Sequence, residues 1–172
     1  MTILHTELTG GTQLARGTQE FHLAKPAGFE FSPGQSIDLS LTGTPDGTPL
    51  QDVMHTFSLV SAPHEGQLTV ATRMRDSAFK NALAALPVGA ALQFEGPFGT
   101  ALVPDDSARP LVLIAGGIGI TPFMSILRDA AYRQLQRPLR LLYSNRRPED
   151  TAFLAELQQL QQQYPPFSLV AT

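Results

Sequence analysis

The sequence predicts a β plus α/β fold in which a six-stranded antiparallel barrel precedes a partial parallel sheet with helices. The first observation is a series of short apolar strands separated by turn residues up to about residue 95, as in barrels and sandwiches. The second is a change, after Pro104-Asp105-Asp106, to strands that alternate with helices. We therefore predict two domains, residues 1–106 and residues 107–172.

The first domain is expected to hold six strands and one helix. Gly10-Gly11, Pro33-Gly34 and Pro45-Asp46-Gly47 supply turns, and Pro87 ends the helix. Strands of this length suit a small closed barrel. The expected strands are Ile3–Leu8, Thr18–Ala24, Ser36–Leu41, His55–Val60, Leu68–Arg73 and Ala91–Glu95, and the expected helix is Ser77–Leu86.

The second domain is expected to follow a strand–helix–strand–helix–strand order. The apolar run from Leu111 to Ile114 suits a strand that is buried on both faces. Apolar residues at helical spacing, such as Ile126 with Ala130 and Phe153 with Leu157, indicate one core-facing stripe on each helix. The expected elements are Leu111–Ala115, Thr121–Leu135, Leu139–Tyr143, Pro148–Gln162 and Phe167–Val170.

A glycine-rich turn between the first strand and helix of this domain predicts a nucleotide pyrophosphate site. Gly116, Gly117 and Gly119 permit unusual backbone angles and keep side chains away from a diphosphate at the positive end of the helix. Thr121 and Pro122 fit the N-cap and the first helical residue. The string is G-x-G-x-x-P, not the usual G-x-G-x-x-G. A tight connection without a ligand is the alternative interpretation.

Composition excludes several classes of function. The absence of cysteine excludes disulfides, thiolate metal sites, protein-bound iron–sulfur clusters and a cysteine nucleophile, so redox chemistry would need a bound organic cofactor. The net charge of -3 gives no electrostatic signature of a nucleic-acid or anionic-membrane partner. The N-terminus lacks a signal-peptide pattern, and we expect a cytoplasmic protein without a metal site.

Four short segments occur in an order that is similar to that of the ferredoxin–NADP reductase superfamily. They are His55-Thr56-Phe57-Ser58, Arg75-Asp76-Ser77, Gly96-Pro97-Phe98-Gly99 and the turn from Gly116 to Pro122. The chain from about Thr6 to Thr172 resembles this superfamily, whose members join a flavin-binding barrel to a nicotinamide-nucleotide-binding α/β domain. The resemblance implies FAD and NAD(P)H as cofactors.

The resemblance assigns the flavin ring to the segment from His55 to Ser58, which stands in place of the family pattern R-x-Y-S. Phe57 would pack against the ring, and the hydroxyl of Ser58, the predicted catalytic residue, would face its reactive nitrogen. His55 replaces an arginine that contacts the flavin phosphate, and a neutral imidazole offers only one donor. The alternatives are a buried barrel residue for Phe57 and an ordinary strand histidine for His55.

The resemblance also implies a second flavin phosphate contact at the start of the barrel helix, where Ser77 stands. Arg73 and Arg75 lie just upstream and would supply the charge that His55 lacks, with Arg75 the preferred residue. Asp76 or Ser77 only caps the helix in the alternative interpretation, and both arginines then face water.

On the nicotinamide side, the resemblance places the pyrophosphate at Gly116 to Pro122 and the nicotinamide beside Thr121. Gly96 and Gly99 would let the nucleotide approach the flavin closely. The second strand runs into Ser144-Asn145-Arg146-Arg147 without the acid that usually binds the ribose of NAD. Arg146 therefore favours a 2′-phosphate, and hence NADPH over NADH.

The function that the resemblance implies is a flavin-dependent oxidoreductase that passes electrons from NAD(P)H through FAD to an acceptor such as ferredoxin or flavodoxin. The nucleotide domain is C-terminally shortened relative to the family, so weak nucleotide binding and self-association through an incomplete sheet are expected. Two alternatives stay open. The chain is an FAD-binding electron-transfer or regulatory module without NAD(P)H turnover, or it is a structural fragment without a ligand.

Overall fold

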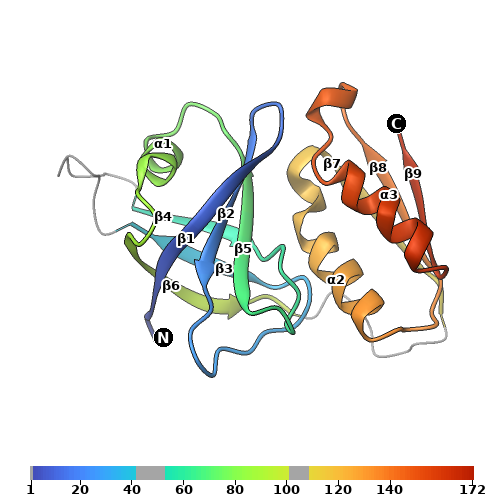
Figure 1. The fold of residues 1–172 in the computed structure, drawn as a ribbon, viewed down its shortest axis with the longest axis horizontal. Helices are drawn as coiled ribbons and strands as arrows, with labels where there is room; N and C mark the ends of the chain where they lie inside the picture. Colours follow the sequence, from blue (N-terminus) through green and yellow to red (C-terminus); the bar gives the residue numbers. More distant parts are fainter. Residues whose placement is uncertain (1, 42–52, 101–108) are drawn as a thin grey trace.

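The computed structural model describes residues 2–41, 53–100 and 109–172, which form two sheets side by side (Figure 1). The first is a six-stranded antiparallel sheet with the order β4-β3-β6-β1-β2-β5, and the second is a three-stranded parallel sheet with the order β7-β8-β9. The predicted fold class is confirmed. The predicted boundary between residues 106 and 107 lies outside the described residues, and the division into two domains stays a prediction.

The first sheet is curved but not closed. Its edge strands, β4 and β5, approach one another only beside their connection, where Leu59 forms a single bridge with Val70 and the Val60 N–H donates to the Thr69 carbonyl. The prediction of a closed barrel is therefore wrong, because the short β4 separates from β5 beyond this point. The elements are β1 (Leu4–Ala15), β2 (Thr18–Ala24), β3 (Ser36–Ser40), β4 (Met54–Ser58), β5 (Gln67–Arg73), α1 (Ala78–Ala85) and β6 (Ala91–Phe98).

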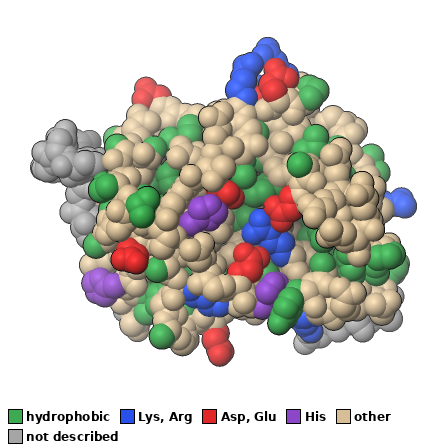
Figure 2. Space-filling view, viewed as in Figure 1, with side chains coloured by type: hydrophobic (Ala, Val, Ile, Leu, Met, Phe, Trp, Pro, Cys, Tyr) green, Lys and Arg blue, Asp and Glu red, His purple; other side chains and the backbone are tan. Residues whose placement is uncertain are grey.

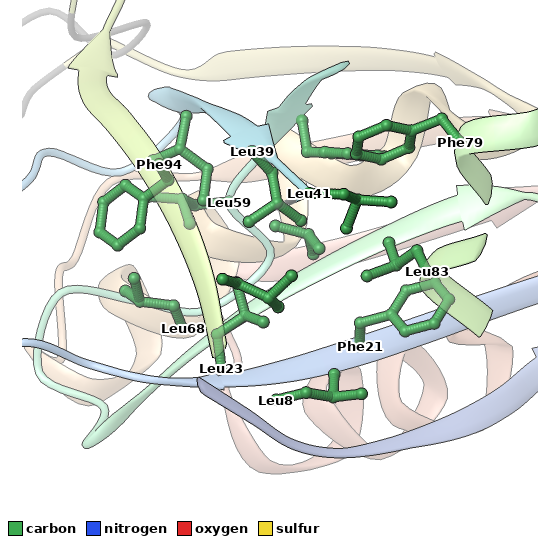
Figure 3. Close-up of a cluster of buried hydrophobic side chains, with 14 of the residues drawn as sticks. Leu8, Phe21, Leu23, Leu39, Leu41, Leu59, Leu68, Phe79, Leu83 and Phe94 are labelled. Atoms are coloured by element: carbon green, nitrogen blue, oxygen red, sulfur yellow. The ribbon is translucent and has the colours of Figure 1, made fainter. Parts of the chain in front are cut away.

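Alternating apolar residues of this sheet point to one side and form its core, as Figure 3 shows. Leu23 on β2 and Leu39 on β3 are fully buried, and so is Phe94 on β6, which meets the ring of Phe29 edge-on at 5.1 Å. Phe79 of α1 is also fully buried and covers one end of the cluster. The core therefore fixes the position of α1 relative to β4.

Gly10 and Gly11 lie within β1, so the prediction of a turn there is wrong. The register between β1 and β2 shifts between Leu8 and Gly10, which marks a bulge. A Cβ on Gly11 would lie 2.9 Å from the carbonyl oxygen of Glu20. Glycine is needed here because the two strands approach closely, and not because the chain reverses.

The second sheet follows the predicted order with two corrections at helix starts. Thr121 is not an N-cap: a 3-10 turn precedes it, and its hydroxyl donates to the Ile118 carbonyl at 3.2 Å. Phe153 has a left-handed backbone with φ of 61° and precedes the second helix. The elements are β7 (Leu111–Gly116), η1 (Gly117–Ile120), α2 (Thr121–Tyr132), β8 (Leu139–Ser144), η2 (Pro148–Asp150), α3 (Leu154–Gln163) and β9 (Phe167–Ala171).

Only one face of the second sheet is covered by the described helices. Leu113, Leu141 and Phe167 pack into one cluster with residues of α2 and α3. On the other face Val112, Ile114 and Val170 are 55%, 72% and 47% exposed. The prediction that β7 is buried on both faces is wrong, because two right-handed crossovers that advance in the same direction place both helices on the same face.

The helix α2 lies between the two sheets and connects them through polar contacts. The Ser125 hydroxyl donates to the Ser61 carbonyl at 2.7 Å. The Arg128 guanidinium donates to both carboxylate oxygens of Glu156, at 2.7 and 2.9 Å, and lies 3.5 Å from a Glu65 oxygen. Figure 2 shows basic atoms flanked by acidic atoms near the middle of this face. We call Arg128, Glu65, Glu156 and the neighbouring Glu20 the junction cluster.

The uncharged run from Pro110 to Leu127 forms β7, the η1 turn and the first part of α2. It is therefore a strand, a turn and a helix in sequence. Within the described ranges, every helix is too short or too polar to cross a membrane.

Candidate functional site

The larger candidate site is a cavity of about 690 Å³ between the first sheet and the carboxyl ends of β7 and β8. Openings at the carboxyl ends of parallel strands are the usual ligand positions in such sheets. The cavity brings the glycine turn together with Arg73 and Arg75, at and just after the end of β5, and with Arg146, which follows β8. Its lining residues are Arg73, Arg75, Gly116, Gly117, Ile118, Ser144, Asn145 and Arg146.

The glycines of the turn face open space. A Cβ on Gly116, Gly117 or Gly119 would meet no atom of the described residues within 4 Å, apart from the residues directly before and after that glycine. Gly117 has a φ of 52°, which itself favours glycine, whereas Gly116 has an extended backbone with φ of -122° that any residue adopts. Neither packing nor backbone strain explains glycine at position 116. The choice between a ligand-binding turn and a merely tight connection stays a prediction.

Arg73 and Arg75 line this larger cavity together with the glycine turn. Their assignment to the flavin phosphate stays a prediction. A guanidinium nitrogen of Arg73 lies 3.5 Å from a carboxylate oxygen of Asp150, whose side chain is almost fully buried. Arg75 is exposed. The contact between Arg73 and Asp150 joins the end of β5 to the η2 turn and holds the Arg73 side chain beside the glycine turn.

The smaller candidate site is a cavity of about 350 Å³ that adjoins the first one at Ile118. It brings residues 55–58 of β4, which we call the β4 segment, together with the glycine turn, as the resemblance implies. Some 60 residues separate the two in the chain. The residues lining it are His55, Thr56, Phe57, Ser58, Ala71, Thr72, Lys80, Ile118, Gly119, Thr121 and Pro122.

The two aromatic residues of the β4 segment face the core of the first sheet. The His55 ring stacks on Phe79 with centroids 4.3 Å apart. Phe57 is 6% exposed and belongs to the core cluster of the first sheet, so it is a buried residue. Phe57 and Ser58 still line the smaller cavity, and their roles beside a flavin ring stay predictions.

Ser77 caps α1, because its hydroxyl oxygen accepts a hydrogen bond from the Lys80 N–H at 3.4 Å. The Lys80 side chain lines the smaller cavity, and its ammonium donates to the Arg73 carbonyl at 3.0 Å. Burial and the nearby Arg75 lower the pKa of Lys80. Lys80 is a site residue that was not predicted, although a basic residue one helical turn after the Ser77 cap was a usable signal in the sequence.

Gly96 and Gly99 line neither cavity. Gly96 has a φ of 146°, and a Cβ there would lie 3.1 Å from Ile37 Cγ2 and 3.2 Å from the Ser36 carbonyl oxygen. Glycine at 96 is therefore required by the approach of β3. The predicted role of both glycines in nucleotide approach stays a prediction.

Comparisons with known proteins show which proteins the chain is similar to. Residues 113–172 match the family described as oxidoreductase NAD-binding domain. Reductase component 2 of terephthalate 1,2-dioxygenase from Comamonas sp. is 32% identical over 117 residues, 67% of this chain and 35% of that protein. The glycine betaine monooxygenase reductase subunit from Chromohalobacter salexigens is 33% identical over 150 residues, 87% of this chain and 40% of that subunit. The chain thus spans less than half of each relative.

Solved structures share the fold over almost the whole chain. A ferredoxin-NADP+ reductase from Plasmodium falciparum superposes with a TM-score of 0.84 at 16% identity, covering 98% of this chain and 70% of that one. Another, from Neisseria gonorrhoeae with bound FAD and NADP, gives 0.82 at 22% identity, with 98% and 67% covered. The resemblance is confirmed at the level of the fold: the chain shares the fold of the ferredoxin-NADP+ reductases, and residues 113–172 match the oxidoreductase NAD-binding domain family.

Proposed function

We propose that this chain is the flavin- and nicotinamide-binding part of an NAD(P)H-dependent flavoprotein reductase. Residues 1–106 form the FAD-binding domain in this proposal, and residues 107–172 form the nucleotide-binding domain. The observation that carries it is the open space in front of Gly116 and Gly117, which line the larger cavity together with its arginines. A glycine turn with a basic wall suits a dinucleotide pyrophosphate.

The larger cavity fits the nicotinamide nucleotide. Amide N–H groups of the turn and the guanidinium groups of Arg73 and Arg75 would bind its pyrophosphate. Arg146, on the same wall, would contact a 2′-phosphate, which makes NADPH the preferred donor. Thr121 and Pro122 on the wall of the smaller cavity would lie beside the nicotinamide.

The smaller cavity fits a flavin, since it offers the hydroxyl groups of Thr56 and Ser58 and the ammonium of Lys80 to a polar, anionic cofactor. Bound FAD would supply the hydride and electron-transfer chemistry. In this proposal Ser58 donates a hydrogen bond to the ring, and Ser77 and the first turn of α1 lie beside the phosphates. The bound FAD in the Neisseria gonorrhoeae structure supports this assignment.

The electron acceptor in this proposal is a separate protein or domain. The related proteins are named as reductase components of dioxygenases and monooxygenases, among them component C of methane monooxygenase from Methylosinus trichosporium. An oxygenase component, or a small carrier such as ferredoxin or flavodoxin, is therefore the proposed acceptor.

Absorption spectroscopy of the purified chain, followed by chromatography of the released cofactor, tests the proposal. We expect flavin bands, FAD as the released flavin, and bleaching of the bands on addition of NADPH. Ser58→Ala is expected to retain FAD and to slow its reduction about fivefold, because one hydrogen bond is worth about 1 kcal/mol. Bands that NADPH does not bleach favour the electron-transfer or regulatory module, and a colourless protein favours the structural fragment.

We also propose that the exposed face of the second sheet mediates association with a second copy of the chain. Val112 and Ile114 of β7, Leu142 of β8 and Val170 of β9 place exposed apolar side chains on three adjacent strands, and an open strand edge favours pairing. Light scattering should give a mass above that of the monomer, and the double substitution Ile114→Ser and Val170→Ser should lower it. A strict monomer at high protein concentration would contradict this part of the proposal.

A further inference from the structure

We propose that Lys80 is the cation that binds the phosphate groups of the flavin nucleotide in this protein. The inference rests on the proposed function and adds to it the residue that selects a phosphorylated flavin. Lys80 takes over the role that the resemblance gives to an arginine at position 55, and for which Arg75 is the residue expected from the sequence.

The backbone of α1 places Lys80 at the start of the helix, with its N–H bonded to the Ser77 cap. Its side chain folds back toward the end of β5, where Nζ donates to the Arg73 carbonyl at 3.0 Å. That hydrogen bond uses one of the three ammonium protons. Lys80 lines the same cavity as Thr56 and Ser58, so its ammonium can reach a ligand that is bound against β4.

The other basic residues near Ser77 are directed elsewhere. Arg73 lies 3.5 Å from the Asp150 carboxylate, and both Arg73 and Arg75 line the larger cavity with Gly116. Neither arginine lines the smaller cavity. Among the lysines and arginines of the described ranges, Lys80 is the one that lines the smaller cavity together with the β4 segment.

His55 lines the same cavity but is poorly suited to supply the charge. Its ring stacks on Phe79, which is fully buried, with an interplanar angle of 17°. This contact keeps one face of the imidazole against the core. The lysine ammonium, by contrast, carries three donors on a flexible stem. Burial and Arg75 already lower the pKa of Lys80, so an anion bound at its ammonium would relieve an unfavourable environment.

The test compares flavins that share a ring but differ in phosphate. The flavin-free chain is titrated with FAD, FMN and riboflavin by fluorescence quenching, for the wild type and for Lys80→Gln, which keeps a donor for the Arg73 carbonyl. We expect FAD and FMN affinity to fall about 10- to 100-fold, because a charge-assisted hydrogen bond is lost, and riboflavin affinity to stay unchanged. Lys80→Arg should restore most of the loss.

Two control variants sharpen the result. Lys25→Gln removes the other lysine of the chain, whose ammonium also donates to a backbone carbonyl, that of Pro63 at 2.6 Å, and should leave all three affinities unchanged. Arg75→Gln should weaken NADPH binding and leave FAD binding unchanged. Added KCl should weaken FAD binding more steeply in the wild type than in Lys80→Gln.

Equal losses for FAD and riboflavin would overturn the inference, since they would show a structural role for Lys80. Unchanged FAD affinity in Lys80→Gln, or a loss in Arg75→Gln alone, would overturn it as well. A wild-type chain that binds none of the three flavins would instead refute the proposed function. Thermal melts of each variant show whether a loss comes from unfolding.

Discussion

Substitution of Gly116 by valine is expected to weaken NADPH binding by about 30-fold or more, which corresponds to about 2 kcal/mol, and to leave protein stability nearly unchanged. The backbone at Gly116 is extended, with φ of -122° and ψ of 123°, and a β-branched residue favours such angles. A Cβ there meets open space, so the fold accepts it. The added methyl groups instead occupy the space in front of the turn. Calorimetric titration and thermal melts measure both quantities.

Gly96→Ala provides the matched control, because the opposite result is expected. Its φ of 146° and the close Ile37 side chain make any Cβ at this position unfavourable, at a cost of about 1 to 3 kcal/mol of stability. Gly96 lines neither cavity, so the folded fraction should bind NADPH normally. If Gly116→Val binds NADPH as tightly as the wild type, the turn is only a tight connection and the larger cavity is not the nucleotide site.

Arg128→Met is expected to lower the free energy of unfolding by about 2 kcal/mol at pH 7. The variant loses the two hydrogen bonds to Glu156 and leaves the carboxylates of the junction cluster facing one another without a cation. The expected loss in the free energy of unfolding is smaller than that for a fully buried ion pair, because Glu156 is partly exposed. Urea unfolding measures the loss, and Arg133→Met, which removes an exposed partner of Asp129, should cost less than about 0.5 kcal/mol.

The loss in Arg128→Met should depend on pH. Burial raises the pKa of Glu20 above 4.5, while His22 and Arg128 lower it. Ionised Glu20 therefore lowers the free energy of unfolding. This penalty is absent below the pKa that Glu20 has in the unfolded chain, where both states are protonated. It develops as the pH rises from that value through the higher pKa of the folded state. Removal of Arg128 enlarges the penalty, so the loss should be greater at pH 7 than near pH 4. An equal loss at both pH values would show that lost packing, and not charge, explains the variant.

Local patterns in the sequence were sufficient for most of the secondary structure and for the glycine turn. The alternation of Phe21 and Leu23 with polar neighbours predicted β2 with its correct bounds, because a half-buried strand places every second side chain in the core. The change from apolar strand to glycines to helix located the turn at 116–119. The predicted start of α2 at Thr121 is correct, but the N-cap role of Thr121 and the start of α3 after Phe153 were wrong, because short 3-10 turns leave no periodic pattern.

The sequence by itself thus determined the two kinds of sheet, the resemblance and the residues of the turn. Tertiary structure decided which residues share a cavity: Arg73 and Arg75 join the glycine turn, whereas Lys80 joins the β4 segment. It also decided that one face of the second sheet is exposed, since that depends on the direction in which the crossovers advance. Such neighbours come from elements far apart in the chain, and their contacts are set by how the sheets and α2 pack together, which no local pattern contains.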